Sequence, residues 1–87
     1  VRQHVRTRTR NAADRTARER YARLSERERE VLSLVVAGLT NKEIGRALAL
    51  SPRTVENHRA HVFDKLQAES LAQVVRQYAE LVERAAE

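Results

Sequence analysis

The segment 52–66 carries the residues of this chain best suited to specific chemistry, and that chemistry is hydrogen bonding. At about 100° per residue, Val55, Val62 and Leu66 share one side of a helix, and a polar side lies opposite. The polar side carries Arg53, Asn57, Ala60 and Asp64, with Glu56 at its edge; the candidates for base reading are Arg53, Glu56, Asn57 and Ala60. Arg can bond guanine, Asn can bond adenine, Glu can accept from cytosine, and Ala permits close approach in a major groove. The pattern predicts base reading in double-stranded DNA; an ordinary solvated helix face is the alternative.

Residues that could fix the register of this helix on a DNA backbone lie beside it in the sequence. Hydroxyls, basic side chains and the N–H groups at helix N-termini are the groups that contact phosphates. The candidates are Thr40, Asn41, Lys42, Ser51, Thr54, Arg59, His61 and Lys65. Each could equally be a helix cap or a surface charge, and Thr40 and Ser51 are expected to cap helices in either case.

No catalytic or metal-binding constellation is evident. His58 and His61 have i, i+3 spacing, but the chain has no cysteine and no carboxylate placed to complete a tetrahedral zinc site. Neither a nucleophile with its base nor a glycine-rich phosphate loop occurs. We therefore predict that the chain is not an enzyme and uses neither a metal nor a cofactor.

Helix start and stop signals divide most of the chain into four helices. Capping boxes begin at Ser25 and Thr40, and Ser51 followed by Pro52 is a third start signal. The expected helices span about residues 26–37, 41–48, 52–66 and 71–83. The short gap between the second and third suits a helix-turn-helix crossing. Gly45 costs about 1 kcal/mol of helix propensity, so it indicates close approach of the next helix; a neutral accident is the alternative.

The expected helix over residues 71–83 has a broad apolar stripe that looks wider than one small core can cover. We expect a homodimer interface there, formed by Leu71, Val74, Val75, Tyr78 and Leu81. A symmetric dimer would bind a roughly palindromic site.

Composition favours one small all-α domain, because the 87 residues are 41% hydrophobic but only 3% aromatic. The net charge of +5 is unevenly distributed. Residues 1–23 hold eight Arg against two carboxylates, a net of +6, whereas residues 24–87 hold nine Lys and Arg against ten carboxylates, a net of −1. We expect residues 1–23 to be an interdomain linker, either helical from about residue 12 or a solvated arm, and residues 24–87 to be the domain. Without a signal peptide or a run of roughly 18 apolar residues, a cytoplasmic protein with no membrane contact is expected.

Several separated motifs, in order, give the chain a family likeness. They are Leu24-Ser25-Glu26-Arg27-Glu28-Arg29-Glu30-Val31-Leu32, Gly38-Leu39-Thr40-Asn41-Lys42-Glu43-Ile44, Leu50-Ser51-Pro52-Arg53-Thr54-Val55-Glu56-Asn57-His58-Arg59 and Lys65-Leu66. Over about residues 24–84 the chain resembles the LuxR/FixJ/NarL-type helix-turn-helix output domain, especially the FixJ branch of two-component response regulators. The resemblance implies a four-helix domain without a wing, whose third helix reads the major groove and whose fourth helix dimerises. Its base-reading positions would fall on Glu56, Asn57 and Ala60.

The resemblance also implies partners. A receiver domain in cis, phosphorylated on an aspartate, would control the output domain; 87 residues are too few to hold both. RNA polymerase is a further candidate partner. One departure concerns generic helix-turn-helix proteins, which favour glycine where Ala49 stands, so the geometry of the turn is left open.

Two other functions remain as alternatives. A module like sigma-factor region 4, which contacts promoter and polymerase, has a similar helix-turn-helix, although the helix start at residues 51–55 and the fourth helix favour the regulator. A protein-interaction or dimerisation module, whose Arg-rich arm docks an acidic partner, is the other.

Overall fold

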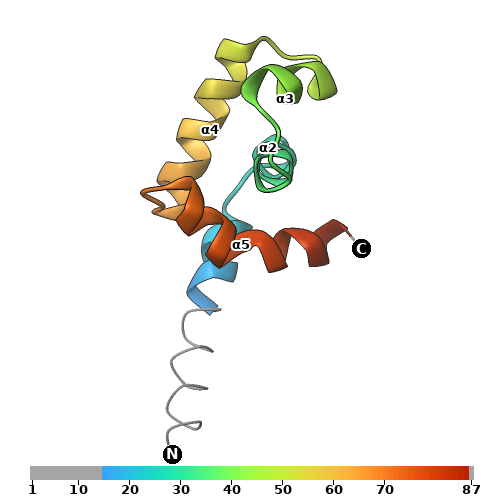
Figure 1. Cartoon of the computed structure of the whole chain (residues 1–87). Coiled ribbons are helices and arrows are strands. Elements are labelled where there is room, and N and C mark those ends of the chain that lie inside the picture. The colour runs from blue at the N-terminus through green and yellow to red at the C-terminus, as the bar shows by residue number, and fades with distance from the viewer. Residues whose placement is uncertain (1–14, 87) are drawn as a thin grey trace, which may run out of the picture.

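The computed structural model describes residues 15–86, and all regular structure in that range is helical. A helical segment at residues 15–22 precedes α2 (Glu26–Val36), α3 (Asn41–Leu48), α4 (Pro52–Leu66) and α5 (Leu71–Ala86). In Figure 1, α2 is seen nearly end-on, with α4 to its left, α3 above it and α5 below it. The all-α prediction is confirmed. The expected bounds differ by one residue at the end of α2 and by three at the end of α5, which continues to Ala86.

Reciprocal hydrogen bonds fix the starts of α2 and α3. The Ser25 hydroxyl accepts from the N–H of Glu28 at 3.1 Å, while the Ser25 N–H donates to Glu28 Oε1 at 2.8 Å. Thr40 and Glu43 make the same pair of bonds at 3.2 and 2.9 Å. Because each box satisfies two backbone N–H donors within four residues, the local sequence alone sets these helix starts. Both predicted capping boxes are confirmed.

The turn between α3 and α4 depends on the absence of a side chain at Gly45. A Cβ added there would lie 2.5 Å from the Leu50 carbonyl oxygen. The Leu50 N–H in turn donates to the Gly45 carbonyl at 2.8 Å. Ala49, between them, takes the left-handed conformation with φ 58° and ψ 46°, which costs an L-residue about 1–2 kcal/mol. The predicted close approach is confirmed, and Ala49 adopts the conformation for which other helix-turn-helix proteins use glycine.

The buried side chains form two clusters that meet on α2. One cluster joins α2 to α4, α5 and the N-terminal helical segment and contains Ala17, Leu24, Leu32, Val62, Leu66, Val74, Tyr78 and Val82. The other joins α2 to α3 and α4 and contains Val31, Val35, Ile44 and Val55. Because α2 contributes to both, it fixes the position of the α3–α4 pair relative to α5.

The helical segment at residues 15–22 packs on this body, although it falls within the expected linker. Ala17 is buried, and Arg20 Nη1 donates a long hydrogen bond of 3.5 Å to the Leu66 carbonyl. From α2, Arg29 Nη2 donates to the Ala22 carbonyl at 3.1 Å, and its guanidinium carbon lies 5.3 Å from the centre of the Tyr21 ring. The expectation of a solvated arm is therefore wrong for residues 15–22. The expected helix start near residue 12 lies outside the described residues.

Candidate nucleic-acid interface

The polar face of α4 is open to solvent. Its four expected base-reading residues, Arg53, Glu56, Asn57 and Ala60, are all exposed. Val55, Val62 and Leu66 on the opposite side are buried, as the periodicity predicts. Within residues 15–86, the three polar side chains of this face make no hydrogen bond or ion pair. Their donors and acceptors are therefore free for an external partner.

The hydroxyls at the start of α4 are already partly engaged. Ser51 caps the helix by accepting from the Thr54 N–H at 3.1 Å, and its oxygen lies 2.9 Å from the Thr54 hydroxyl. One hydroxyl proton serves this contact, so the other is left for an outside acceptor such as a phosphate oxygen. Thr40 is engaged as the cap of α3. The two caps thus stabilise the helix starts on both sides of the α3–α4 turn, and a hydroxyl donor remains at the surface of the turn.

Two residues that were expected to contact DNA phosphates, Asn41 and Arg59, form a hydrogen bond with each other. Arg59 Nη1 donates to Asn41 Oδ1 at 3.0 Å, which joins the middle of α4 to the first residue of α3. The Arg59 guanidinium carbon also lies 6.0 Å from the centre of the Phe63 ring. Lys42 and His61, by contrast, are exposed and have no hydrogen-bond partner among the described residues. Sequence patterns mark Asn41 and Arg59 as separate candidates and give no sign of their contact, because 18 positions separate the two residues.

Lys65 has its partner inside the protein. Its Nζ lies 2.7 Å from Glu28 Oε1, whose side chain is only 7% exposed. Burial alone would raise the pKa of Glu28, but hydrogen bonds from Lys65 and the Ser25 N–H, with the charge of Lys65, hold it below its ordinary value of 4.5. Glu28 therefore caps α2 and also anchors the C-terminal half of α4. A phosphate role for Lys65 stays a prediction, because its ammonium serves Glu28 first.

The expected dimer residues divide between surface and core. Leu71 and Val75 are 46% and 40% exposed, and Leu81 is half-buried. Val74 and Tyr78 are fully buried, and the Tyr78 hydroxyl donates to the Leu66 carbonyl at 3.2 Å. Their assignment to an interface is therefore wrong. The α5 stripe looked too wide for one core, but α2, α4 and residues 15–22 share one buried cluster with it, and Val74 and Tyr78 belong to that cluster.

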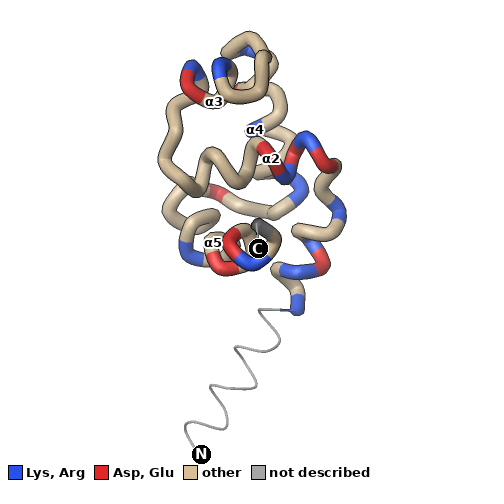
Figure 2. The backbone as a smooth tube through the Cα atoms, turned by 90° about the vertical axis from the view of Figure 1, so that its right-hand side faces the viewer, with Lys and Arg blue, Asp and Glu red and all other residues tan. Residues whose placement is uncertain are grey.

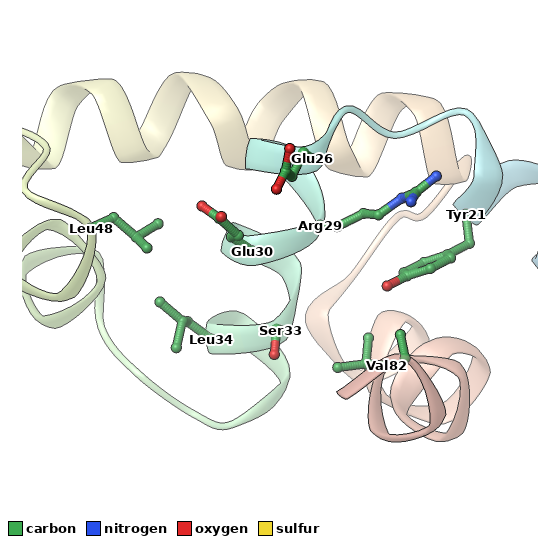
Figure 3. Close-up of a pocket in the computed structure, with 9 residues that line it drawn as sticks. Tyr21, Glu26, Arg29, Glu30, Ser33, Leu34, Leu48 and Val82 are labelled. Atoms are coloured by element: carbon green, nitrogen blue, oxygen red, sulfur yellow. The ribbon is translucent and has the colours of Figure 1, made fainter. Parts of the chain in front are cut away.

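A groove of about 470 Å³ lies away from the polar face of α4 (Figure 3). Its lining comes from the N-terminal segment, α2, α3 and α5: Tyr21, Glu26, Arg29, Glu30, Ser33, Leu34, Leu48, Val82 and Ala85. No residue of α4 lines it. The groove is thus separate from the candidate DNA-binding face.

Charges of both signs are interspersed along α2 and α5, as Figure 2 shows. This distribution agrees with the net charge of −1 over residues 24–87. Attraction to a polyanion must therefore come from the few cations near α4, because the domain has no general excess of positive charge.

No three His, Cys, Asp or Glu side chains in residues 15–86 are grouped as metal ligands. None of the helices described is long and apolar enough to cross a membrane.

The tight α3–α4 turn and the open polar face of α4 define a helix-turn-helix protein of the DNA-binding class. The family model for "Bacterial regulatory proteins, luxR family" matches residues 22–78, and the chain belongs to that family. It is a LuxR-type transcriptional regulator domain and not an enzyme.

Among its relatives, the chain is 61% identical over 59 residues to the transcriptional regulatory protein FixJ of Rhizobium meliloti, covering 68% of this chain and 29% of that protein. It is 46% identical over 61 residues to the tetrathionate response regulatory protein TtrR of Salmonella typhimurium, covering 70% of this chain and 30% of that protein. The crystal structure of full-length FixJ from B. japonicum matches with a TM-score of 0.72 and 46% identity, over 78% of this chain and 34% of that one. The chain thus spans about three tenths of the length of these curated relatives.

Proposed function

We propose that this domain binds double-stranded DNA sequence-specifically, as the output domain of a response regulator, with α4 in the major groove. The observation that carries the proposal is the open face of α4, where the polar groups of Arg53, Glu56 and Asn57 have no partner in residues 15–86. Ala60 on the same face lets the helix backbone approach the bases. The tight turn at Gly45 holds this face beside the start of α3.

Substitutions at Asn57 and Lys42 test this assignment. On a site selected from a random DNA pool, Asn57→Ala should lose about 1–3 kcal/mol of binding free energy and barely change binding to unrelated duplex, because Asn57 reads a base. Lys42→Ala should weaken both, because a phosphate contact is independent of sequence. Fluorescence anisotropy with labelled duplexes measures both affinities. Equal losses on the two duplexes for Asn57→Ala would contradict base reading.

Arg27→Ala is a matched charge control. Arg27 pairs with Glu30 at 3.0 Å on the exposed surface of α2, a helix that supplies none of the proposed DNA or dimer contacts. Its removal changes the net charge as Lys42→Ala does, so it should leave affinity nearly unchanged. A loss as large as that of Lys42→Ala would show that only total charge matters.

The proposed contacts to the DNA sugar-phosphate backbone come from both sides of the turn. The residues that would make or support these contacts are Thr40, Asn41, Lys42, Ser51, Thr54, Arg59, His61 and Lys65. Each cation that neutralises a phosphate should contribute about 0.9 to the slope of log K against log salt. Measuring that slope for single Lys→Ala and Arg→Ala variants counts the contacts.

Dimerisation is proposed through the exposed part of α5, namely Leu71 and Val75 with the half-buried Leu81. Two copies would then bind a roughly palindromic site. Sedimentation at increasing concentration, with and without the selected DNA, measures the association. A strict monomer on that DNA would remove the dimer from the proposal.

We also propose that a receiver domain controls this output domain in cis, since the relatives include response regulators much longer than the matched segment. The Arg-rich residues 1–14 would add sequence-independent affinity for DNA. Their deletion should lower the salt slope and leave the preferred sequence unchanged. A changed sequence preference would show that this segment reads bases. The deletion ends at residue 14 because Ala17 is part of the core.

A further inference from the structure

The contact between Asn41 and Arg59 gives α3 and α4 a polar link at the candidate DNA-binding face. Residues 18 positions apart meet there, with 3.0 Å between Arg59 Nη1 and Asn41 Oδ1. Both side chains are half-buried, so water competes less for this bond than at a fully exposed site.

Arg59 is restrained on a second side as well. Its guanidinium lies against the Phe63 ring, and Phe63 packs on the larger core cluster. A guanidinium has five N–H donors, and the bond to Asn41 uses one of them. The remaining donors can bind an anion while the group stays in place.

The side-chain oxygen of Asn41 cannot hydrogen-bond a DNA phosphate. Oδ1 is an acceptor, as are phosphate oxygens, and it already accepts from Arg59. The orientation of the Asn41 amide is therefore set by Arg59. Lys42, the next residue, is exposed and has no partner in residues 15–86, so nothing restrains its side chain in the same way.

We propose that Asn41 is a positioning residue for Arg59: its amide oxygen holds the guanidinium ready to bind a DNA phosphate, and Asn41 acts on DNA affinity through Arg59. The inference rests on the proposed DNA binding and assigns different roles to two residues of that interface. Holding a donor in its bound geometry raises affinity because less side-chain freedom is lost on binding.

A double-mutant cycle tests the proposal. Asn41→Ala should weaken binding about 5-fold, the equivalent of immobilising one long side chain on binding, on the selected site and on unrelated duplex alike. On the Arg59→Ala background the same substitution should change affinity less than about 2-fold, because its target is gone. An equal factor on both backgrounds would overturn the proposal, since Asn41 would then contact DNA independently of Arg59.

A spectroscopic measurement separates positioning from a loss of structure. In the ¹⁵N-labelled domain, the Arg59 Nε–Hε signal can be assigned by its absence in Arg59→Lys. Asn41→Ala should move that signal to the position of solvated arginines, while the backbone amide signals of α2 and α5 stay in place. An unmoved Arg59 signal would overturn the proposal, and so would general shifts across α2 and α5. If the unaltered domain binds no duplex at all, the proposed DNA binding is contradicted. If the domain binds DNA but Asn41→Ala causes the same fold-loss with and without Arg59, only the positioning role is contradicted.

Discussion

Gly45 offers the sharpest test of how the helix-turn-helix is built. On helix propensity alone, Gly45→Ala should stabilise α3 by about 1 kcal/mol. The structure predicts the opposite, because the new Cβ would lie 2.5 Å from the Leu50 carbonyl oxygen. That oxygen belongs to the backbone and cannot rotate away as a side chain could. Relief requires the turn to move.

The size of the effect follows from what holds the turn. Overpacking costs about 1–3 kcal/mol, and moving the turn also weakens the Leu50 N–H bond to the Gly45 carbonyl, worth about 1 kcal/mol. Subtracting the propensity gain leaves a net loss of about 1–3 kcal/mol of unfolding free energy. For a domain of this size the melting temperature should fall by about 4–24 °C. The DNA affinity of the folded fraction should fall too, because α4 shifts relative to α3.

Thermal and urea unfolding, together with anisotropy on the selected duplex, measure the two effects of Gly45→Ala. Gly38→Ala is the matched control. Gly38 has φ 94°, and apart from Gly38 and its two chain neighbours no atom of the described chain lies within 4 Å of an added Cβ. Gly38→Ala should therefore lose about 1 kcal/mol of stability through backbone strain alone and keep the DNA affinity. A Gly45→Ala protein as stable as the unaltered domain, with unchanged affinity, would refute this account of the turn.

Three further predictions concern other contacts. Ala49→Gly should raise the unfolding free energy by up to about 1 kcal/mol, because glycine adopts the left-handed conformation without strain. The melting temperature should rise accordingly, and a fall would contradict this prediction. Glu28→Gln should cost about 1–3 kcal/mol at neutral pH, because a neutral amide oxygen accepts more weakly than the carboxylate from the Lys65 ammonium and the Ser25 N–H. Since the folded pKa of Glu28 is depressed, its contribution is present above the unfolded value of about 4.5 and lost as pH falls through the folded value. Urea titrations should therefore show the two proteins converging as the pH falls below about 4.5, and a difference that stays constant with pH would argue against this coupling. Tyr78→Phe should lose about 1 kcal/mol by removing the hydroxyl bond to the Leu66 carbonyl, and an unchanged urea midpoint would exclude that contribution.

Features governed by near neighbours in the chain could be predicted well. The boxes at Ser25 and Thr40 were predictable because the cap and its partner are three residues apart. The polar face of α4 follows from helical periodicity, and the close approach at Gly45 follows from the cost of glycine in a helix. These signals were enough to predict the helix-turn-helix and its exposed face.

The packing of residues 15–22 could not be predicted from helix caps and periodicity. The apolar stripe of this segment is thin, and its docking depends on Arg20 and Arg29, which meet backbone carbonyls on other elements. No local pattern marks an arginine that will find such a carbonyl. Val74 and Tyr78 of α5 are buried in the cluster that α2, α4 and this segment share, so the predicted interface on α5 was too wide.

The sequence by itself determined which segments form helices, where they begin, and which side of α4 is polar, because caps and periodicity act over a few residues. Only the tertiary structure decided which of those polar groups remain free. Lys65 meets Glu28 across 37 positions and Arg59 meets Asn41 across 18, and both pairs form because α4 crosses α2 and α3 at these points. A hydrogen bond needs its two atoms within about 3 Å, and for residues so far apart only the packed arrangement of the helices can meet that requirement.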